Sequence, residues 1–419
     1  MRLSPAKSLQ VFIPFACGYF LSYLYRVVNA VIAPDLVADI GVGPAQLGLL
    51  TSAYFISFAA FQLPLGVLLD RVGPRRVEAG LLLFAGLGAF VFARSHTVTG
   101  LIIGRALIGF GVSACLMAAF KAFVMWFERQ QLPLVNGFQM AAGGLGALAA
   151  TAPVETALRF TDWRGVFTAL ALLTLLVALL IFWVVPDRES GGSRESLRDQ
   201  LNGVAYVFSN LVFWRVAPWT VMSQATFLSI QGLWAGPWLR DVAGLSRDGT
   251  ANTLFWVASA MVIGFISLGA LTERLSRAGI RPMLVAGAGM LIFMGLQLLV
   301  ILEVTAWVLP LWILFGVFGT TGIIPYAILS QSFPANLSGR VNTAVNLMVF
   351  VAAFAAQWGI GSVINRWPVS ASGMYAPEGY QAAFAIMLGL QVVAFAWYLL
   401  AGVIMGLKNR SNQIAPGRD

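Results

Sequence analysis

Charged residues are scarce in this chain of 419 residues, where Asp, Glu, Lys and Arg together make up 10%. Histidine is nearly absent, with His96 alone, and the two cysteines, Cys17 and Cys115, both lie in apolar runs. These shortages exclude a His-based metal site, a His-dependent catalytic triad and a disulfide framework. A nucleotide-binding glycine loop is also missing. We therefore expect no enzymatic activity, no ATP-driven transport and no cofactor.

Apolar residues are what the chain has in excess, at 59% with a mean hydropathy of +0.83. A soluble domain is about 45–50% apolar and about 25% charged, and no water-soluble globule of this size hides so much apolar surface. The composition also excludes a disordered chain and a nucleic-acid-binding protein. The net charge of +9 has a simple explanation in a membrane protein, because its cytoplasmic loops are basic.

Twelve segments are apolar enough to cross a bilayer, which takes about 20 residues each. The expected spans are residues 9–34, 46–69, 77–95, 98–125, 133–154, 166–185, 215–238, 250–271, 283–302, 306–330, 341–364 and 380–404. The sequence thus predicts an all-α membrane protein with twelve transmembrane helices.

A single long polar segment divides these spans six and six. We expect an N-terminal six-helix bundle over residues 1–186, a cytoplasmic linker over 187–211 and a C-terminal six-helix bundle over 212–419. In the linker, Ser196 either caps a short amphipathic helix on the membrane surface or belongs to a flexible charged connection.

The basic residues predict the orientation. With both termini inside, 17 of the 26 Lys and Arg residues fall in cytoplasmic segments, and six fall outside. Cytoplasmic loops are enriched in these residues, so we expect an N-in/C-in topology in a bacterial inner membrane. The three cations left within predicted spans are Arg26, Arg105 and Lys121.

The two halves repeat at one constant offset. Pro34 and Leu36 correspond to Pro237 and Leu239, and Gly41 corresponds to Gly244; Gly66 and the pair Asp70-Arg71 match Gly269 and Glu273-Arg274. An offset that holds through two helices and a loop predicts parallel structural repeats, hence two pseudo-symmetric bundles.

The loop after the second span carries the clearest motif. Gly66-Val-Leu-Leu-Asp70-Arg71-Val-Gly73-Pro-Arg75-Arg76 resembles the loop signature of the major facilitator superfamily, and the pattern is degenerate in the second half. Arg105 to Gly111 and Asp162-Trp163-Arg164 are also similar to that superfamily. The resemblance covers the whole chain and implies a secondary transporter whose halves rock about a central site.

The first span, from Gly18 to Leu36, is similar to organophosphate:phosphate antiporters and organic-anion symporters. In those families an Arg at the place of Arg26 binds the substrate anion. The corresponding position in the seventh span is Ser229 instead of a second Arg, which argues against phosphate-ester exchange. Tyr25 stands where many organic-anion:proton symporters carry an acid.

Arg26 is the strongest candidate for substrate binding. It lies about 13 Å deeper than Asp35 along a helix, and a guanidinium costs at least about 2.5–3.5 kcal/mol there unless it faces protein or water. Ser22, Arg26 and Asn29 share one helix face, so we expect a cavity lined by this face, with Tyr25 beside it. The alternative is that Arg26 only ties helices together.

For the two other cations within predicted spans, two roles remain open. Lys121 either attracts anions in the cavity or snorkels to the cytoplasmic interface. Arg105 acts in coupling and gating, as the resemblance implies, or forms a polar tie between helices. In the loop motif, we expect Asp70 to act as a latch with Gly66, Arg71 and Gly73, whereas Arg75 and Arg76 serve gating or only set the topology.

Further polar residues of spans seven, ten and eleven are candidates for substrate contact or for ties between helices: Gln224, Gln231, Trp234, Tyr326, Asn342 and Asn346. The acidic residues are expected at span ends or in loops, with Asp35, Glu155 and Glu303 nearest to the core. Proton coupling would then require Asp35, Glu155 or the substrate's own acid.

We therefore expect a secondary active transporter for a small organic anion, a carboxylate, working by alternating access with proton coupling or exchange. Its partners are the anionic substrate, the bilayer and protons, with no nucleic acid, and we expect a monomer. Two alternatives remain: a proton-driven exporter of drugs or metabolites, in which Arg26 and Arg105 are structural, and a non-transporting membrane sensor of the same fold.

Overall fold

The computed structural model describes residues 5–128, 132–187, 197–334, 337–370 and 373–414. In these ranges the regular structure is entirely helical, as the sequence predicts. The first half contains α1 (Pro5–Val27), α2 (Asn29–Ile40), α3 (Pro44–Arg71), α4 (Pro74–Arg94), α5 (Val98–Gly111), α6 (Cys115–Trp126), α7 (Leu132–Ala149), α8 (Ala152–Leu158) and α9 (Trp163–Val184).

The short helix α10 (Leu197–Phe208) follows in the predicted linker, where an amphipathic helix was one of the two alternatives. The second half contains α11 (Leu211–Ser229), the π-helical turn η1 (Ile230–Trp234), α12 (Ala235–Asp241), α13 (Arg247–Arg277), α14 (Pro282–Ile301), α15 (Val308–Gly319), the 3₁₀ turn η2 (Thr320–Ile323), α16 (Ile324–Gln331), α17 (Ser338–Ile364) and α18 (Pro377–Ile414).

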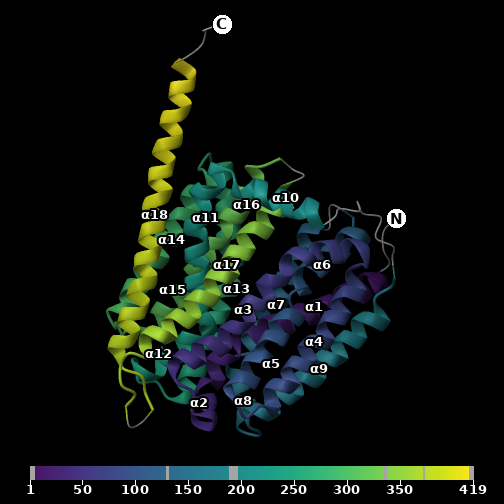
Figure 1. Cartoon of the computed structure of the whole chain (residues 1–419), viewed down its shortest axis with the longest axis vertical. Helices are drawn as coiled ribbons and strands as arrows, with labels where there is room; N and C mark the ends of the chain where they lie inside the picture. Colours follow the sequence, from purple (N-terminus) through teal and green to yellow (C-terminus); the bar gives the residue numbers. More distant parts are fainter. Residues whose placement is uncertain (1–4, 129–131, 188–196, 335–336, 371–372, 415–419) are drawn as a thin grey trace.

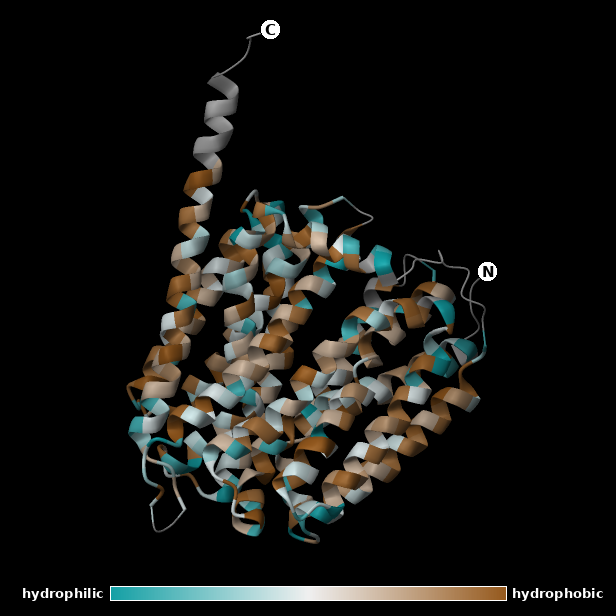
Figure 2. Ribbon diagram, viewed as in Figure 1, coloured by the Kyte–Doolittle hydropathy of each residue, from teal (hydrophilic) through white to brown (hydrophobic). Residues whose placement is uncertain are grey.

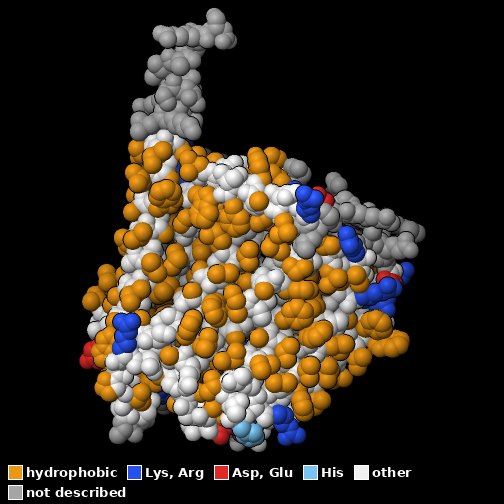
Figure 3. Space-filling view, viewed as in Figure 1, with side chains coloured by type: hydrophobic (Ala, Val, Ile, Leu, Met, Phe, Trp, Pro, Cys, Tyr) orange, Lys and Arg blue, Asp and Glu red, His pale blue; other side chains and the backbone are white. Residues whose placement is uncertain are grey.

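Ten helices or helix pairs of the described chain are long and apolar enough to cross a membrane. The two predicted spans outside this set coincide with α7–α8 and with α11–η1–α12, both of which are interrupted. Figure 2 shows hydrophobic residues along the helices and hydrophilic residues concentrated toward the two ends. In Figure 3 hydrophobic side chains are spread over the middle of the visible face and the charged side chains lie toward its edges, as expected for a multi-pass membrane protein.

Corresponding spans of the two halves are interrupted at corresponding places. The first span breaks between α1 and α2, and the seventh passes through η1; the fourth breaks between α5 and α6, and the tenth passes through η2. The paired glycines Gly41 and Gly244 both adopt positive φ, at 72° and 66°. The backbone thus has the same unusual features in both halves, as the internal repeat predicts.

Local sequence explains where α9 starts. The side chain of Asp162 accepts a hydrogen bond from the amide of Gly165 at 2.7 Å and caps α9, while Trp163 Nε1 donates to Asp39 at 3.1 Å. Arg164 also contacts Asp39, and this guanidinium lowers the pKa of the Asp39 carboxyl. The Asp-Trp-Arg motif therefore fixes the start of α9 against the end of α2.

Figure 1 shows how the two halves lie side by side, with α2, α8 and α12 at one end and α6, α10 and α16 at the other. The halves contact each other mainly where α3 packs on α17 and α7 packs on α13. We name the first end the α8 end and the second the α10 end.

Candidate functional site

A cavity of about 910 Å³ lies between the two halves. It begins beside Arg26 of α1 and extends to Val204 of α10 and Arg340 near the start of α17, so it reaches the α10 end of the molecule. Helices of both halves line it. Its volume is in the range of small-molecule binding sites, about 300–1,000 Å³.

The four helix interruptions that correspond between the halves border this cavity. Arg26 lies in the last turn of α1, Ser113 lies between α5 and α6, Gln231 lies in η1, and Ile323 ends η2. Interrupted helices at corresponding positions of two repeats are typical of the substrate sites of membrane transporters. π-Helical turns are also frequent at functional sites.

Arg26 is buried, with 8% of its surface exposed, and its guanidinium lies among four aromatic rings. The carbon Cζ is 4.5 Å from the ring centre of Tyr23, 5.4 Å from Phe350, 5.6 Å from Phe58 and 5.9 Å from Tyr54. Its Nε has no hydrogen-bond partner, and no carboxylate of the described residues pairs with it. The rings stabilise the cation, and the Nε donor is left for a ligand.

Most of the other predicted substrate contacts also line the cavity. Ser22 Oγ lies 3.4 Å from the hydroxyl of Tyr54, and Gln224 Nε2 donates to the carbonyl of Gly319 at 3.3 Å. The carboxamide oxygen of Asn342 is buried without a partner. The predicted residues that the structure brings to the cavity, besides Arg26, are Ser22, Lys121, Gln224, Gln231, Tyr326, Asn342 and Asn346.

Three predicted residues lie outside the cavity lining and pack between helices. Tyr25 shares a hydrogen bond with Thr174 at 2.8 Å, Asn29 Nδ2 donates to Thr51 at 2.9 Å, and Trp234 Nε1 donates to the carbonyl of Gln357 at 3.0 Å. The polar helix face predicted to continue from Ser22 to Asn29 is not maintained, because the helix is interrupted after Val27.

Arg105 is 1% exposed, and its Nη1 donates to the carbonyl oxygen of Tyr25 at 2.8 Å. This carbonyl belongs to the last turn of α1, directly beside Arg26. A side chain that bonds to a helix carbonyl is a known cause of helix interruption. The contact corresponds to the polar tie between helices, one of the two roles predicted for Arg105.

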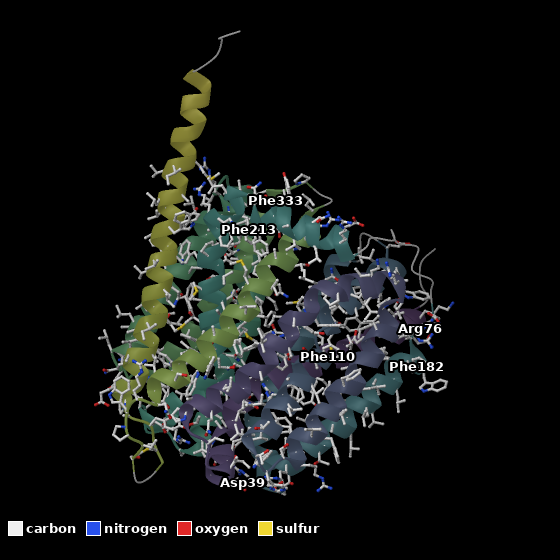
Figure 4. All side chains as sticks on the ribbon, viewed as in Figure 1. Asp39, Arg76, Phe110, Phe182, Phe213 and Phe333 are labelled. Carbon is white, nitrogen blue, oxygen red and sulfur yellow. The ribbon has the colours of Figure 1, made fainter. Side chains whose placement is uncertain are left out.

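The two arginines at the end of the loop motif, Arg75 and Arg76, form contacts within the first part of the chain. Gly73 has a φ of 90°, Arg75 Nε donates to the carbonyl of Phe182 at 2.8 Å, and Arg76 pairs with Asp187 at 2.7 Å. Arg75 therefore binds the end of α9, and Arg76 binds Asp187 just beyond it; Figure 4 shows Arg76 and Phe182 in the same region of the molecule.

The remaining latch residues are placed differently. Gly66 lines the cavity. Arg71 is exposed. The side chain of Asp70 lies outside the described part of the structure.

Sequence reasoning missed one buried acid and most of the aromatic wall. Asp35, Glu155 and Glu303 were expected to be the acids nearest to the core, and this is wrong, because the side chain of Glu78 is 0% exposed. In sequence it lies near the start of a span, where an acid is ordinary. Tyr23, Phe58 and Phe350 were missed because aromatic residues occur throughout apolar helices.

The α8 end, marked by Asp39 in Figure 4, is closed by contacts between the halves. Arg247 at the start of α13 binds both carboxylate oxygens of Asp35 at 2.6 and 2.9 Å and also Glu155 at 2.6 Å. Arg159 pairs with Asp248 at 2.6 Å. Asp35 and Glu155, which the sequence offered for proton coupling, are thus both bound to one arginine.

Comparison with known proteins gives a consistent family. A family model described as Major Facilitator Superfamily matches residues 15–357. Similar curated proteins include a probable sulfoacetate transporter of Cupriavidus necator, 27% identical over 43% of either chain. A probable L-galactonate transporter of Escherichia coli is 24% identical over 62% of this chain and 61% of its own. A hexuronate transporter of the same species is 26% identical over 48% and 50%. The chain thus spans about half the length of these relatives.

Solved structures share the fold at low sequence identity. A bacterial homologue of the human lysosomal transporter Spinster, inward-facing and unoccupied, superposes with a TM-score of 0.77 at 16% identity and covers 96% of this chain and 98% of its own. A D-xylose–proton symporter gives a TM-score of 0.71 at 16% identity and covers 92% and 97%.

Proposed function

Because this chain belongs to the major facilitator superfamily, we propose that it is a secondary active transporter that moves a small organic anion, a carboxylate, by alternating access. The fold and the relatives are those of transporters and not of enzymes. The observation that carries the proposal is the unpaired Arg26 guanidinium at the inner end of a cavity between the halves. A carboxylate satisfies it with two parallel charge-assisted hydrogen bonds.

The relatives support an anionic substrate. Their names mention sulfoacetate, L-galactonate and hexuronate, which are organic acids ionised at neutral pH. Lys121 and Arg340 add positive charge to the wall between Arg26 and the α10 end. A basic cavity concentrates anions and repels cations.

The membrane arrangement completes the proposal. We assign twelve spans in two bundles over residues 1–186 and 212–419, joined by the linker 187–211, with both termini in the cytoplasm of a bacterial inner membrane. The excess of Lys and Arg in the segments near the α10 end supports this orientation. The cavity then faces the cytoplasm while the α8 end is closed, and exchange or proton symport drives the cycle.

The test uses purified protein in liposomes with sulfoacetate, L-galactonate and galacturonate as probes. Arg26→Gln removes the charge and keeps the polarity, so we expect uptake to be lost and binding of the preferred probe to weaken by about 2–5 kcal/mol, as for other truncated charge pairs. Arg94→Gln is the matched control, because Arg94 ends α4 far from the cavity lining. Uptake by Arg26→Gln with unchanged affinity would refute the assignment.

A further inference from the structure

Glu78 is a buried acid that the proposed binding site does not use. It lies in the second turn of α4 and is 0% exposed, and neither of its carboxyl oxygens has a hydrogen-bond partner. An ionised carboxylate in such a place costs several kcal/mol, whereas the neutral acid is tolerated. Glu78 therefore carries a proton in this conformation.

Three helices enclose the carboxyl group. A Cβ atom added at Gly18 of α1 would lie 2.2 Å from Glu78 Oε1, so a glycine leaves the room that the carboxyl occupies. Ile181 of α9 borders the same space. Cys115, the first residue of α6, is the titratable side chain that interacts with Glu78. The two cations at the start of its own helix are turned elsewhere: Arg75 toward Phe182 and Asp187, and Arg76 toward Asp187.

The same two interrupted spans join Glu78 to the anion site. On α1, Gly18 touches Glu78, Ser22 lines the cavity one turn later, and Arg26 follows after another turn, about 12 Å from Gly18 along the helix. On the fourth span, Arg105 binds the turn of Arg26, and Cys115 follows the break directly. If anion binding moves α1 or the break between α5 and α6, the packing of these helices over the Glu78 carboxyl therefore changes.

Electrostatics predicts the direction of the coupling between anion binding at Arg26 and protonation of Glu78. When the cavity is empty, the unpaired charge of Arg26 favours the carboxylate form of Glu78, and a bound anion cancels that effect. If the helical rise of about 12 Å from Gly18, beside the Glu78 carboxyl, to Arg26 is taken as the separation of the two charges, then at an effective dielectric constant near 20 the interaction is worth roughly a factor of ten in either equilibrium. Because linkage is reciprocal, protonation of Glu78 strengthens anion binding by the same factor.

We propose that Glu78 is the proton-binding site that couples proton movement to transport of the anion held by Arg26. This inference rests on the proposed function. One proton binds with each anion; on release the O–H bond of Glu78 breaks, the proton passes to water, and the carboxylate keeps the electron pair. No oxidant, reductant or second reactant is required.

The experiment compares wild type with Glu78→Gln in liposomes that contain a pH-sensitive dye, with sulfoacetate, L-galactonate and galacturonate as probes. We expect an inward gradient of the preferred probe to acidify the lumen with wild type. Glu78→Gln should keep anion counterflow and lose the acidification. Binding to wild type should weaken about tenfold as the pH rises through the titration of Glu78, and binding to Glu78→Gln should not respond. Glu378→Gln, at an exposed position of α18, is the control for loss of an acid.

A direct readout separates coupling from structure. Infrared difference spectra should contain a carboxylic-acid band that depends on probe binding and is missing in Glu78→Gln. Three results would each overturn the inference. Glu78→Gln could move protons and anions in the wild-type ratio, the band could be absent in wild type, or Glu78→Gln could lose counterflow together with proton flux. If wild type moves none of the three probes, the proposed function fails first, and the coupling fails with it.

Discussion

Arg105 and Arg26 are both buried, but their guanidinium groups have different tasks. Arg26 lines the cavity and pairs with no carboxylate of the described residues, whereas Arg105 lies outside the lining and binds the backbone of Tyr25. A hydrogen bond between a charged donor and a buried carbonyl is worth about 1.5–3 kcal/mol. Arg105 therefore holds the turn of α1 that carries Arg26, and we regard it as a positioning residue.

We predict that Arg105→Gln weakens anion binding about tenfold, because the turn that orients Arg26 loosens. Thermal-stability titrations with galacturonate and sulfoacetate measure the affinity. The dependence of binding on pH should stay as in wild type, since Glu78 is untouched. A flattened pH profile in Arg105→Gln would instead give Arg105 a role in proton coupling.

The residue scale also shows what sequence can predict. Arg26 was predictable because a cation in the middle of an apolar span is costly and needs a reason. The burial of Glu78 was not predictable, because it depends on the glycine at position 18 and on the packing of α6 and α9 over the carboxyl group. The side-chain partners of Tyr25, Asn29 and Trp234 lie between 22 and 149 residues away in sequence, so periodicity could not place them.

Among the elements, α3 and α17 form the most extensive contact between the halves. A Cβ atom at Gly361 of α17 would lie 2.3 Å from the carbonyl oxygen of Pro44, and one at Gly48 of α3 would lie 2.7 Å from that of Gln357. These contacts lie toward the α8 end, since α3 begins there. Backbone atoms at such distances cannot yield to a methyl group without separating the helices.

We predict that Gly361→Ala destabilises the closed α8 end by about 1–3 kcal/mol, the usual cost of overpacking. A cysteine introduced at Val31, which is 6% exposed here, should then react faster with a maleimide. Gly359→Ala is the matched control on the same helix, because a Cβ atom there meets nothing within 4 Å. Equal labelling rates in the two variants would contradict this account of the contact.

The helix interruptions show a limit of prediction for elements. Hydropathy located the spans because a bilayer requires about 20 apolar residues, but it predicted each span as one uninterrupted helix. The breaks in the first and fourth spans contain no proline. They depend on tertiary contacts such as Arg105 with the carbonyl of Tyr25, which no window of neighbouring residues contains.

At the scale of the whole molecule, the sequence predicted two halves but not which end of the cavity is closed. That depends on free energies of contacts that form in one conformation and break in the other. At the α8 end these contacts are the Arg247 cluster and the close glycine contacts between α3 and α17; at the α10 end Arg75 and Arg76 of the loop motif form contacts within the first part of the chain.

Arg247 is the most consequential of these contacts because one side chain binds acids on α2 and α8. Of its partners, Glu155 has 8% of its side chain exposed and Asp35 has 26%, so the pairs are better shielded than ordinary surface bridges. Arg247 itself is 44% exposed, and solvent screening reduces the contribution. We estimate roughly 1–2 kcal/mol in favour of the closed α8 end, which corresponds to about a tenfold change in the population of the two conformations.

We therefore predict that Arg247→Gln increases the labelling rate of the Val31 cysteine about tenfold, with the protein lacking that cysteine as the blank for Cys17 and Cys115. Arg159→Gln is the control at the same end, because its pair with Asp248 is 59% and 68% exposed and contributes little. Saturating galacturonate or sulfoacetate should reduce the effect if the anion binds the conformation described here more tightly. If the Val31 cysteine is labelled at the same rate in Arg247→Gln and in Arg159→Gln, the close glycine contacts between α3 and α17, and not Arg247, hold this end closed.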